Sequence, residues 1–242
     1  MDITAHTHVA DIATSEPATI KVFQRYNLDF CCGGKLPLAD VCAQHGIDQA
    51  AILNDLRSAV TAPGDPEDWQ QASLTSLIAH IQTRYHKPLR EELERLSQML
   101  VKVVSRHGDR LPDVLLPLQQ TFELMRRELL DHIVKEDAVL FPAIIAIEQG
   151  RDVAGLWIAR PIKIMESEHE AAGAALARMR DLTRGYAPPE GACPTFRGLY
   201  YGLSEFEREM HVHVHLENNI LFPRAARLAL HRHSTSLTPE RS

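Results

Sequence analysis

Apolar residues recur every three or four positions along most of this 242-residue chain, and β-branched residues rarely alternate with polar ones. A repeat of three to four residues is typical of amphipathic α-helices, whereas strands repeat every two. The pattern therefore predicts an all-α protein. Four long helices are expected, at about residues 73–106, 113–149, 153–184 and 193–231.

Short breaks rich in glycine, proline and polar residues separate the four expected helices. Such residues start and stop helices, and short connections make consecutive helices antiparallel neighbours. We therefore expect residues 67–242 to form an up-down-up-down four-helix bundle. Residues 1–66 are expected to form a small N-terminal helical domain, with two or three short helices within about residues 10–60 and a linker containing two prolines and a glycine.

The second and fourth helices carry the same motif, in which a glutamate follows a histidine by four residues and Leu-Phe-Pro comes shortly after. The two copies are 81 residues apart with no slippage, and a histidine in each of the other two helices lies at a near-matching offset of 83 residues. This arrangement indicates a duplicated helical hairpin with pseudo-twofold symmetry. The residues concerned are His86, His132, Glu136, His169, His213 and Glu217.

These six residues lie on the apolar seams of their helices, at similar depths in the expected bundle. A spacing of four residues places each histidine above its glutamate on one helix face. In the second helix the seam runs through Met125, Leu129, His132, Glu136 and Val139. A buried carboxylate without a partner costs several kcal/mol, so two of them beside four histidines predict bound cations.

The set of side chains narrows the identity of those cations. Four histidines and two carboxylates are too many for one tetrahedral zinc ion and too rich in nitrogen for magnesium or calcium. Two ions fit better, with Glu136 and Glu217 bridging and two histidines on each ion, which leaves open positions of the kind that non-haem iron uses. Two iron ions are therefore expected, with manganese or zinc left open by the sequence.

Other histidines and cysteines receive different interpretations. His211 and His215 fall outside the seam of the fourth helix and are expected on the surface. Cys31 and Cys32 precede two glycines and a stretch that can start a helix, and a helix N-terminus lowers the pKa of a thiol. These two cysteines are candidates for thiol transfer, for binding a metal or nitrosyl group, or for docking a partner's cluster.

Side chains beside the expected ligands form a second group of candidates. The glutamates flanking His169 are typical of a solvated face, yet one of them is a candidate for orienting the imidazole, and Tyr85 is a similar candidate beside His86. Pro88 lies inside the first long helix and indicates a local kink. The flanking glutamates are Glu166, Glu168 and Glu170.

Composition and charge exclude several classes of function. The net charge of −6 and the isoelectric point near 6.1 provide no basic stripe for nucleic acid. No stretch has the roughly 18 apolar residues that span a membrane, and the start of the chain does not resemble a signal peptide. Four cysteines without framework spacing suit a reducing compartment, so the cytoplasm is expected.

Five motifs give this chain a family resemblance. From about residue 10 to 230 it resembles the iron-sulfur cluster repair di-iron proteins of the RIC family, whose bundle is hemerythrin-like. The motifs are Asp29-Phe-Cys31-Cys32-Gly33-Gly34-Lys35, Arg84-Tyr85-His86, His132-x-x-x-Glu136, Met165-Glu-Ser-Glu168-His169-Glu170, and His213-x-x-x-Glu217-Asn218-Asn219 before Leu-Phe-Pro.

The resemblance implies a function that composition and spacing do not. It implies a cytoplasmic protein that repairs iron-sulfur proteins damaged by nitric oxide or oxidants, through iron donation, reduction of nitric oxide to nitrous oxide, or both. Oxygen carriers of the hemerythrin type differ, because they have a histidine where this chain has Gly173 and an aspartate where it has Glu217. The alternative is an oxygen or nitric oxide sensor or binding protein. An iron store is disfavoured, and a homodimer is compatible with the sequence.

Overall fold

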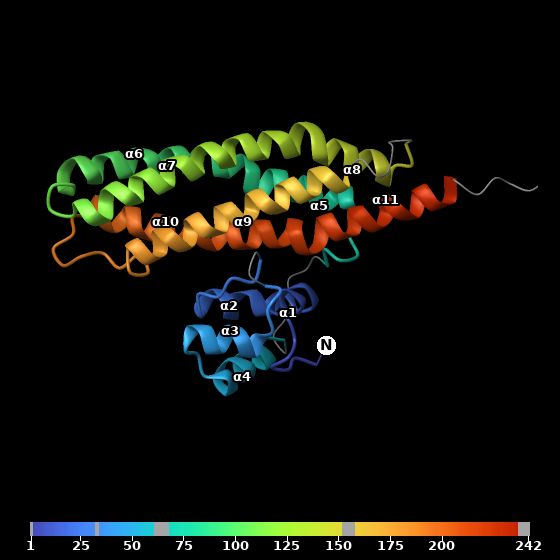
Figure 1. Cartoon of the computed structure of the whole chain (residues 1–242), viewed down its shortest axis with the longest axis horizontal. Helices are drawn as coiled ribbons and strands as arrows, with labels where there is room; N and C mark the ends of the chain where they lie inside the picture. Colours follow the sequence, from blue (N-terminus) through green and yellow to red (C-terminus); the bar gives the residue numbers. More distant parts are fainter. Residues whose placement is uncertain (1, 32–33, 61–67, 152–157, 237–242) are drawn as a thin grey trace, which may run out of the picture.

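The computed structural model describes the backbone of residues 2–31, 34–60, 68–151 and 158–236, and every regular element within them is helical. The prediction of an all-α fold is confirmed. Four antiparallel rods form a bundle, and a small cluster of short helices lies against one side of it (Figure 1). Within the described residues, no helix combines the length and the apolar character needed to cross a bilayer.

Each rod except the third is two α-helices joined by a π-helical segment. Their bounds are α5 (Leu74–Ile81), Gln82–His86 and α6 (Lys87–His107); α7 (Pro112–Lys135), Glu136–Leu140 and α8 (Phe141–Glu148); α9 (Ala159–Leu182); and α10 (Pro194–His215), Leu216–Leu221 and α11 (Phe222–Ser236). These rods match the four predicted helices closely. The expected start of the third, at residue 153, lies outside the described residues.

Each π-helical segment is followed two residues later by a proline. The prolines are Pro88, Pro142 and Pro223, each at the second position of the next α-helix. Proline has no amide hydrogen and its ring clashes with the carbonyl four residues earlier, so a regular α-helix cannot continue through it. A wider turn accommodates the ring, which explains why these helices continue past their prolines.

The extra residue in a π turn shifts the helical register, and one seam residue was therefore predicted wrongly. Val139 is 47% exposed, whereas its neighbour Leu140 is buried at 2%. Both lie in the segment Glu136–Leu140, so the apolar face after Glu136 advances by one residue. The prediction for Val139 assumed an uninterrupted α-helix, which the π turn replaces.

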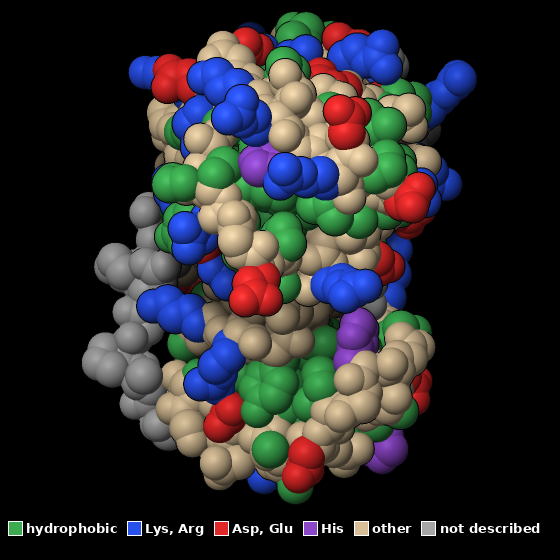
Figure 2. Space-filling view, turned by 90° about the vertical axis from the view of Figure 1, so that its left-hand side faces the viewer, with side chains coloured by type: hydrophobic (Ala, Val, Ile, Leu, Met, Phe, Trp, Pro, Cys, Tyr) green, Lys and Arg blue, Asp and Glu red, His purple; other side chains and the backbone are tan. Residues whose placement is uncertain are grey.

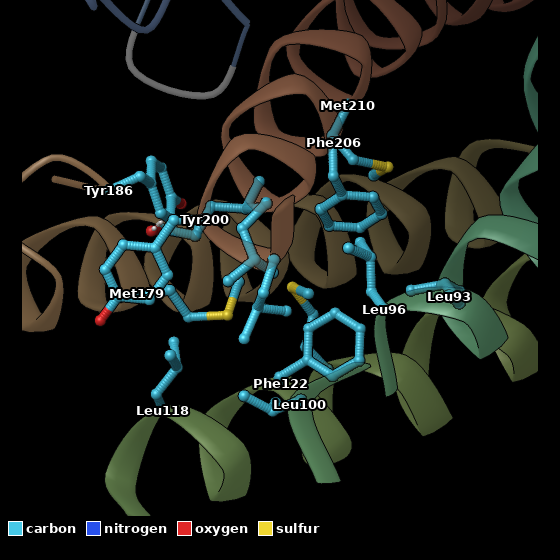
Figure 3. Close-up of a cluster of buried hydrophobic side chains, with 14 of the residues drawn as sticks. Leu93, Leu96, Leu100, Leu118, Phe122, Met179, Tyr186, Tyr200, Phe206 and Met210 are labelled. Carbon is cyan, nitrogen blue, oxygen red and sulfur yellow. Dashed lines mark hydrogen bonds between the residues drawn. The ribbon is translucent and has the colours of Figure 1, made fainter. Parts of the chain in front are cut away.

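The bundle core is divided by its polar layer. On one side, leucine, phenylalanine and methionine side chains from α6, α7, α9 and α10 interlock, including Leu96, Phe122 and Phe206 (Figure 3). On the other side, α5, α8 and α11 enclose a second apolar cluster that contains Ile144 and Phe222. The expected metal ligands lie between these two clusters, where water has little access.

The N-terminal unit contains α1 (Val9–Ser15), α2 (Ile20–Arg25), α3 (Leu38–His45) and α4 (Gln49–Val60), with a short 3₁₀ turn before α2. The prediction of two or three helices was therefore too low. Its own core includes Phe23 and Phe30, whose rings stack with centroids 6.0 Å apart. Figure 2 views the end of the molecule on the left of Figure 1, where basic and acidic side chains intermingle.

Candidate metal centre

All six predicted residues lie together in the polar layer of the bundle. None is more than 2% exposed, and they form two groups that share both glutamates. Within each group the nitrogen and oxygen atoms lie within 4.8 Å of one another, close enough to surround one ion. The groups are His86, His213, Glu136 and Glu217, and His132, His169, Glu136 and Glu217.

Each glutamate reaches at least one histidine of either group. Glu217 lies 3.1 Å from Nε2 of His213 and 3.2 Å from Nε2 of His169. Glu136 lies 3.2 Å from Nε2 of His132 and 3.5 Å from Nε2 of His86. The carboxylates therefore stand between the two pairs of imidazoles, as bridging groups do.

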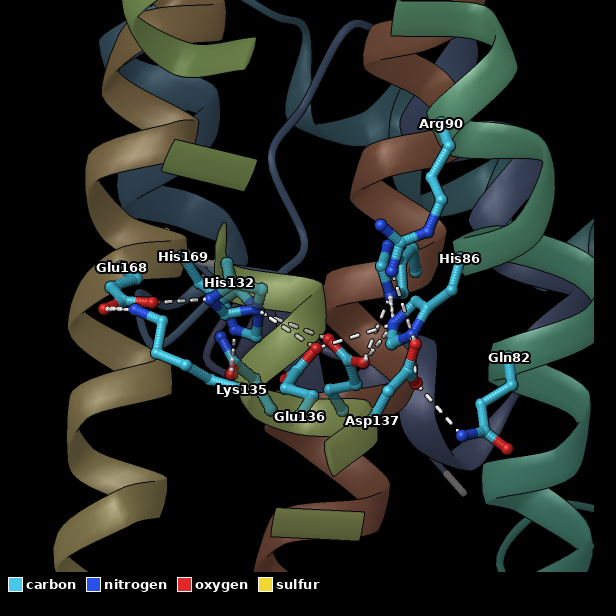
Figure 4. Close-up of polar contacts among 12 residues, drawn as sticks. Gln82, His86, Arg90, His132, Lys135, Glu136, Asp137, Glu168 and His169 are labelled. Atoms are coloured by element: carbon cyan, nitrogen blue, oxygen red, sulfur yellow. Dashed lines mark hydrogen bonds and ion pairs between the residues drawn. The ribbon is translucent and has the colours of Figure 1, made fainter. Parts of the chain in front are cut away.

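Hydrogen bonds on the far side of three rings determine their orientation (Figure 4). Nδ1 of His86 lies 2.8 Å from Asp137, Nδ1 of His132 lies 2.8 Å from Glu168, and Nδ1 of His169 lies 2.8 Å from Oδ1 of Asn218. Carboxylate and amide oxygens accept hydrogen bonds, so each Nδ1 is the protonated nitrogen. The Nε2 lone pair of each ring then points into the centre, as metal binding requires.

The fourth histidine differs from the others. Nδ1 of His213 is buried without a hydrogen bond to the described residues, and its ring stacks on Tyr85 at 5.2 Å with an angle of 4° between planes. Tyr85 therefore positions this imidazole by packing. The prediction placed Tyr85 beside His86, its neighbour in sequence, whereas its ring contact is with a different helix.

The donor set fits a transition-metal ion. Nε2 of His86 faces Nε2 of His213 at 3.0 Å, and Nε2 of His132 faces Nε2 of His169 at 2.9 Å. Two inward lone pairs repel at such distances unless a cation lies near them. Neither oxygen of Glu136 has a hydrogen-bond partner of acceptable geometry, which leaves a buried charge to neutralise. Imidazole nitrogen and carboxylate oxygen suit iron, manganese or zinc.

The electrostatics of the protein without metal also favour cations at this site. Burial pulls the pKa of His132 down, but the Glu136 carboxylate and Glu217 raise it to about 9 overall. Burial also lowers the pKa of His86, but the neighbouring carboxylates outweigh it, so the pKa is raised overall. The pKa of Glu217 is well below its usual range despite burial, because three histidines surround it. The negative potential that retains protons here also attracts metal ions.

A cavity approaches each end of the centre. One, of about 390 Å³, reaches His213 beside Tyr85 and is lined by apolar residues such as Leu89 and Met210 together with charged ones such as Arg84 and Glu209. The other, of about 310 Å³, reaches His132 beside Glu168. Glu168 also contacts Lys135 and its pKa is lowered, since this lysine and His132 outweigh the effect of burial.

Sequence analysis missed two residues of the centre and misplaced three others. Asp137 and Asn218, which were not proposed, each directly follow a glutamate of the repeat, and that position is the signal that identifies them. Glu168 orients His132 and not its neighbour His169. The expectation of surface positions for His211 and His215 is wrong, because they are 8% and 1% exposed beneath the N-terminal unit.

The cysteines occupy different environments. Cys31 is buried at the boundary between the N-terminal unit and the bundle, and Cys32 lies outside the described residues. Cys42 is buried in the core of the N-terminal unit. Cys193 is half-buried, with Sγ 3.4 Å from Nε2 of His107.

An antiparallel four-helix bundle with histidines and glutamates buried midway along its core defines a hemerythrin-like protein. The family described as the hemerythrin HHE cation binding domain matches residues 77–225, and a domain of unknown function (DUF542) matches residues 5–60. The chain belongs to the hemerythrin HHE family and, within it, to the family of YtfE. This membership confirms the resemblance found in the motifs.

Relatives in two species support this assignment. The iron-sulfur cluster repair protein YtfE of Yersinia pseudotuberculosis serotype O:1b (strain IP 31758) is 42% identical over 216 residues, which cover 89% of this chain and 95% of that protein. The protein of the same name in Yersinia pestis (strain Pestoides F) is 41% identical with the same coverage. Together, the hemerythrin-like domain and the buried histidine–glutamate groups support iron binding.

Proposed function

We propose that this chain is a di-iron protein that repairs damaged iron-sulfur clusters, the role that its YtfE relatives are named for. One iron ion is assigned to each histidine–glutamate group, with Glu136 and Glu217 as the bridging ligands. We further propose that residues 67–242 form the iron-binding domain and residues 1–66 a separate domain. The clients are iron-sulfur proteins that have lost iron.

The observation that supports two ions is the position of the glutamates. Each carboxylate lies within 3.5 Å of a histidine from both groups. A single ion bound to one group would leave the other pair of facing imidazoles and half of each carboxylate without a charge to balance them. Two ions satisfy every inward donor, and the shared carboxylates join them.

Iron suits repair better than zinc at such a centre. Two histidines and two shared carboxylates do not fill the coordination sphere of an octahedral ion, so each iron retains open positions for small ligands or a receiving protein. In this role the iron is the substance that the protein transfers, and not a permanent cofactor. The chain holds it through neutral imidazoles, oriented by Asp137, Glu168 and Asn218 on their outer sides.

A specific observation also favours chemistry with a small gas molecule. The cavity beside Tyr85 reaches His213, and its apolar residues, Leu89, Phe206 and Met210, offer an uncharged nitric oxide or oxygen molecule a surface that ions do not favour. Reduction of nitric oxide to nitrous oxide is the second activity we assign to this centre. Two nitric oxide molecules, two protons and two electrons give nitrous oxide and water, and two ferrous ions held here would supply one electron each. Turnover distinguishes it from a sensor, because a sensor binds gas reversibly, retains its iron and releases no nitrous oxide.

Iron content and Mössbauer spectroscopy test the proposal, followed by transfer of isotopically labelled iron to an apo-ferredoxin. We expect two coupled irons in the wild type and none in the Glu136→Ala, Glu217→Ala double variant. The matched control replaces two exposed glutamates, Glu170 and Glu190, with alanine and should behave as wild type. Absence of iron, or one zinc ion in both proteins, would overturn the di-iron assignment, and retained iron without transfer would overturn the repair role.

A further inference from the structure

A second cluster of metal-binding side chains lies where the N-terminal unit meets the bundle. A carboxylate oxygen of Asp29, Sγ of Cys31 and a ring nitrogen of His211 all lie within 4.8 Å of one another. Cys31 and His211 are 5% and 8% exposed. The first two residues follow α2, where the connection to α3 reaches the bundle, and His211 belongs to α10 (Figure 1).

Phe30 holds the two sides of this cluster together. Its ring packs edge-on against His211 at 6.0 Å and against His215 at 5.5 Å. His215 is hydrogen-bonded to the backbone of Phe30 and, at 3.0 Å, to the side chain of Asn219. Asp29 and Cys31, on either side of Phe30 in the chain, are thereby positioned over α10.

His211 has the environment of a ligand that awaits an ion. Its ring is more than nine-tenths buried, yet it makes no hydrogen bond with a described residue. Sγ of Cys31 lies 3.0 Å from Oδ1 of Asp29, to which it donates. A buried imidazole, a thiol and a carboxylate therefore face one another at distances that one ion could bridge.

The charges around the cluster are also suited to a cation. Glu207 lies one helical turn before His211, is 6% exposed, and is 3.5 Å from Arg180. Its pKa is raised, first by burial and then by the negative charge of Asp29, although Arg180 opposes this. The half-buried Asp29 and the buried Glu207 therefore place two acidic groups at the cluster, with Arg180 as a cation next to Glu207.

We propose that Asp29, Cys31 and His211 form a binding site for one divalent transition-metal ion, separate from the centre in the bundle. Thiolate, imidazole and carboxylate together select a borderline-soft ion such as ferrous iron or zinc over magnesium or calcium. Binding displaces the thiol proton of Cys31 to solvent. Three protein ligands leave a fourth position open, as in sites that exchange their ions.

The proposed site connects the two parts of the chain. His211 and His213 are two residues apart on α10, so at 100° per residue they point to nearly opposite faces of the helix. His213 faces the bundle centre and His211 faces the N-terminal unit. An ion bound by Asp29, Cys31 and His211 therefore fastens the N-terminal unit to the outer face of the helix that supplies the bundle's own ligands.

Cobalt(II) added to the full-length protein tests this site. A bond from cobalt to a thiolate gives a charge-transfer absorption band in the near ultraviolet, and the bundle centre contains no cysteine among its grouped residues. The titration uses the Glu136→Ala, Glu217→Ala double variant, in which the bundle centre no longer competes for cobalt. The result therefore does not depend on whether the bundle centre has the proposed function. We expect the band to saturate at one equivalent of cobalt.

Four single variants decide the outcome. Cys31→Ser should abolish the band, and His211→Gln should weaken cobalt binding by at least about tenfold, the lower end of the cost of losing an outer-sphere partner. Cys193→Ser, which removes a cysteine far from the cluster, should leave it unchanged. No thiolate band in the parent protein would overturn the proposal. Undiminished binding in folded His211→Gln, with loss in Cys32→Ser, would place the ion on the cysteine turn alone and also overturn it.

Discussion

Asp137 and Asn218 occupy equivalent positions in the two repeats, 81 residues apart, and each lies 2.8 Å from Nδ1 of a core histidine. Asp137 orients His86 and Asn218 orients His169. One partner is a carboxylate and the other a neutral amide, so the pseudo-twofold symmetry of the bundle is broken in charge. Asp137 is itself held by Gln82 at 3.0 Å.

The outer partners of the histidines predict unequal affinities at the two ends of the centre. The His86–His213 end has Asp137 alone, whereas the other end has Glu168 on His132 and Asn218 on His169. A carboxylate makes the imidazole a stronger ligand than an amide does, so Asp137→Asn should weaken the ion at His86 and His213 by about tenfold. Asn218→Asp should strengthen the other end. Iron release to a chelator, followed as a two-phase time course, measures both. Asp109→Asn, at an exposed position away from the centre, is the control, and equal effects of the two variants on both phases would contradict the prediction.

The six residues of the centre were predictable because two strong patterns coincide. The 81-residue repeat identifies the histidine–glutamate pairs, and the apolar seam places them inside. The π turns were not predictable from periodicity. The sequence shows the three prolines, but whether a proline widens the preceding turn or ends the helix depends on packing. Val139 was misplaced for this reason.

Burial by another unit of the chain is the second limit of sequence reasoning. His211 and His215 lie on the outer face of α10, which is polar by the pattern of its own helix. That face is covered by Phe30, nearly 190 residues away in sequence, and one sequence holds no signal of the contact. Docking surfaces of this kind are found only when the units are seen together.

Removing the metal should destabilise the bundle. Four inward imidazoles and two buried carboxylates then have to be neutralised by protons alone, at a cost of several kcal/mol. We expect chelation to lower the melting temperature of the wild type. Glu136→Leu with Glu217→Leu removes both charges, so the melting temperature of this variant should fall much less on chelation than that of the wild type. A response equal to that of the wild type would show that the metal binds elsewhere.

Glu148 should make stability depend on pH at one end of the bundle. Its carboxylate accepts hydrogen bonds from the backbone amides of Leu74 and Thr75, at 2.7 and 2.8 Å, at the start of α5. Burial raises its pKa, but the Thr75 hydroxyl and these amides lower it overall from 4.5. The ionised form is therefore favoured in the folded state, and the stabilisation is present above pH 4.5 and lost as the pH falls through the lowered pKa.

Glu148→Gln tests this dependence by urea unfolding at several pH values. Near neutral pH the variant should be less stable by about 1 kcal/mol, the usual value of a helix N-terminal acceptor. The difference should shrink as the pH falls below 4.5. Glu170→Gln, at an exposed position on α9, serves as control. A difference that stays constant with pH would mean that the carboxylate acts through packing and not through its charge.

Tyr85 should slow the loss of iron from the end of the centre that it covers. Its ring stacks on His213, whose Nδ1 has no hydrogen bond, and it also lines the cavity that leads to this histidine. Tyr85→Ala removes the ring that stacks on His213, so the imidazole gains rotational freedom and access to water. Release of ferrous iron to a coloured chelator should become about tenfold faster.

A phenylalanine variant of Tyr85 distinguishes the effect of the stacked ring from the effect of the hydroxyl group. Tyr85→Phe keeps the stacking and should release iron at the wild-type rate, and Tyr201→Ala, which removes a tyrosine that is 70% exposed on the same helix as His213, should do so too. If Tyr85→Phe releases iron as fast as Tyr85→Ala, the hydroxyl and not the stacked ring retains the metal. The argument from stacking would then fail, and a polar contact of Tyr85 would take its place.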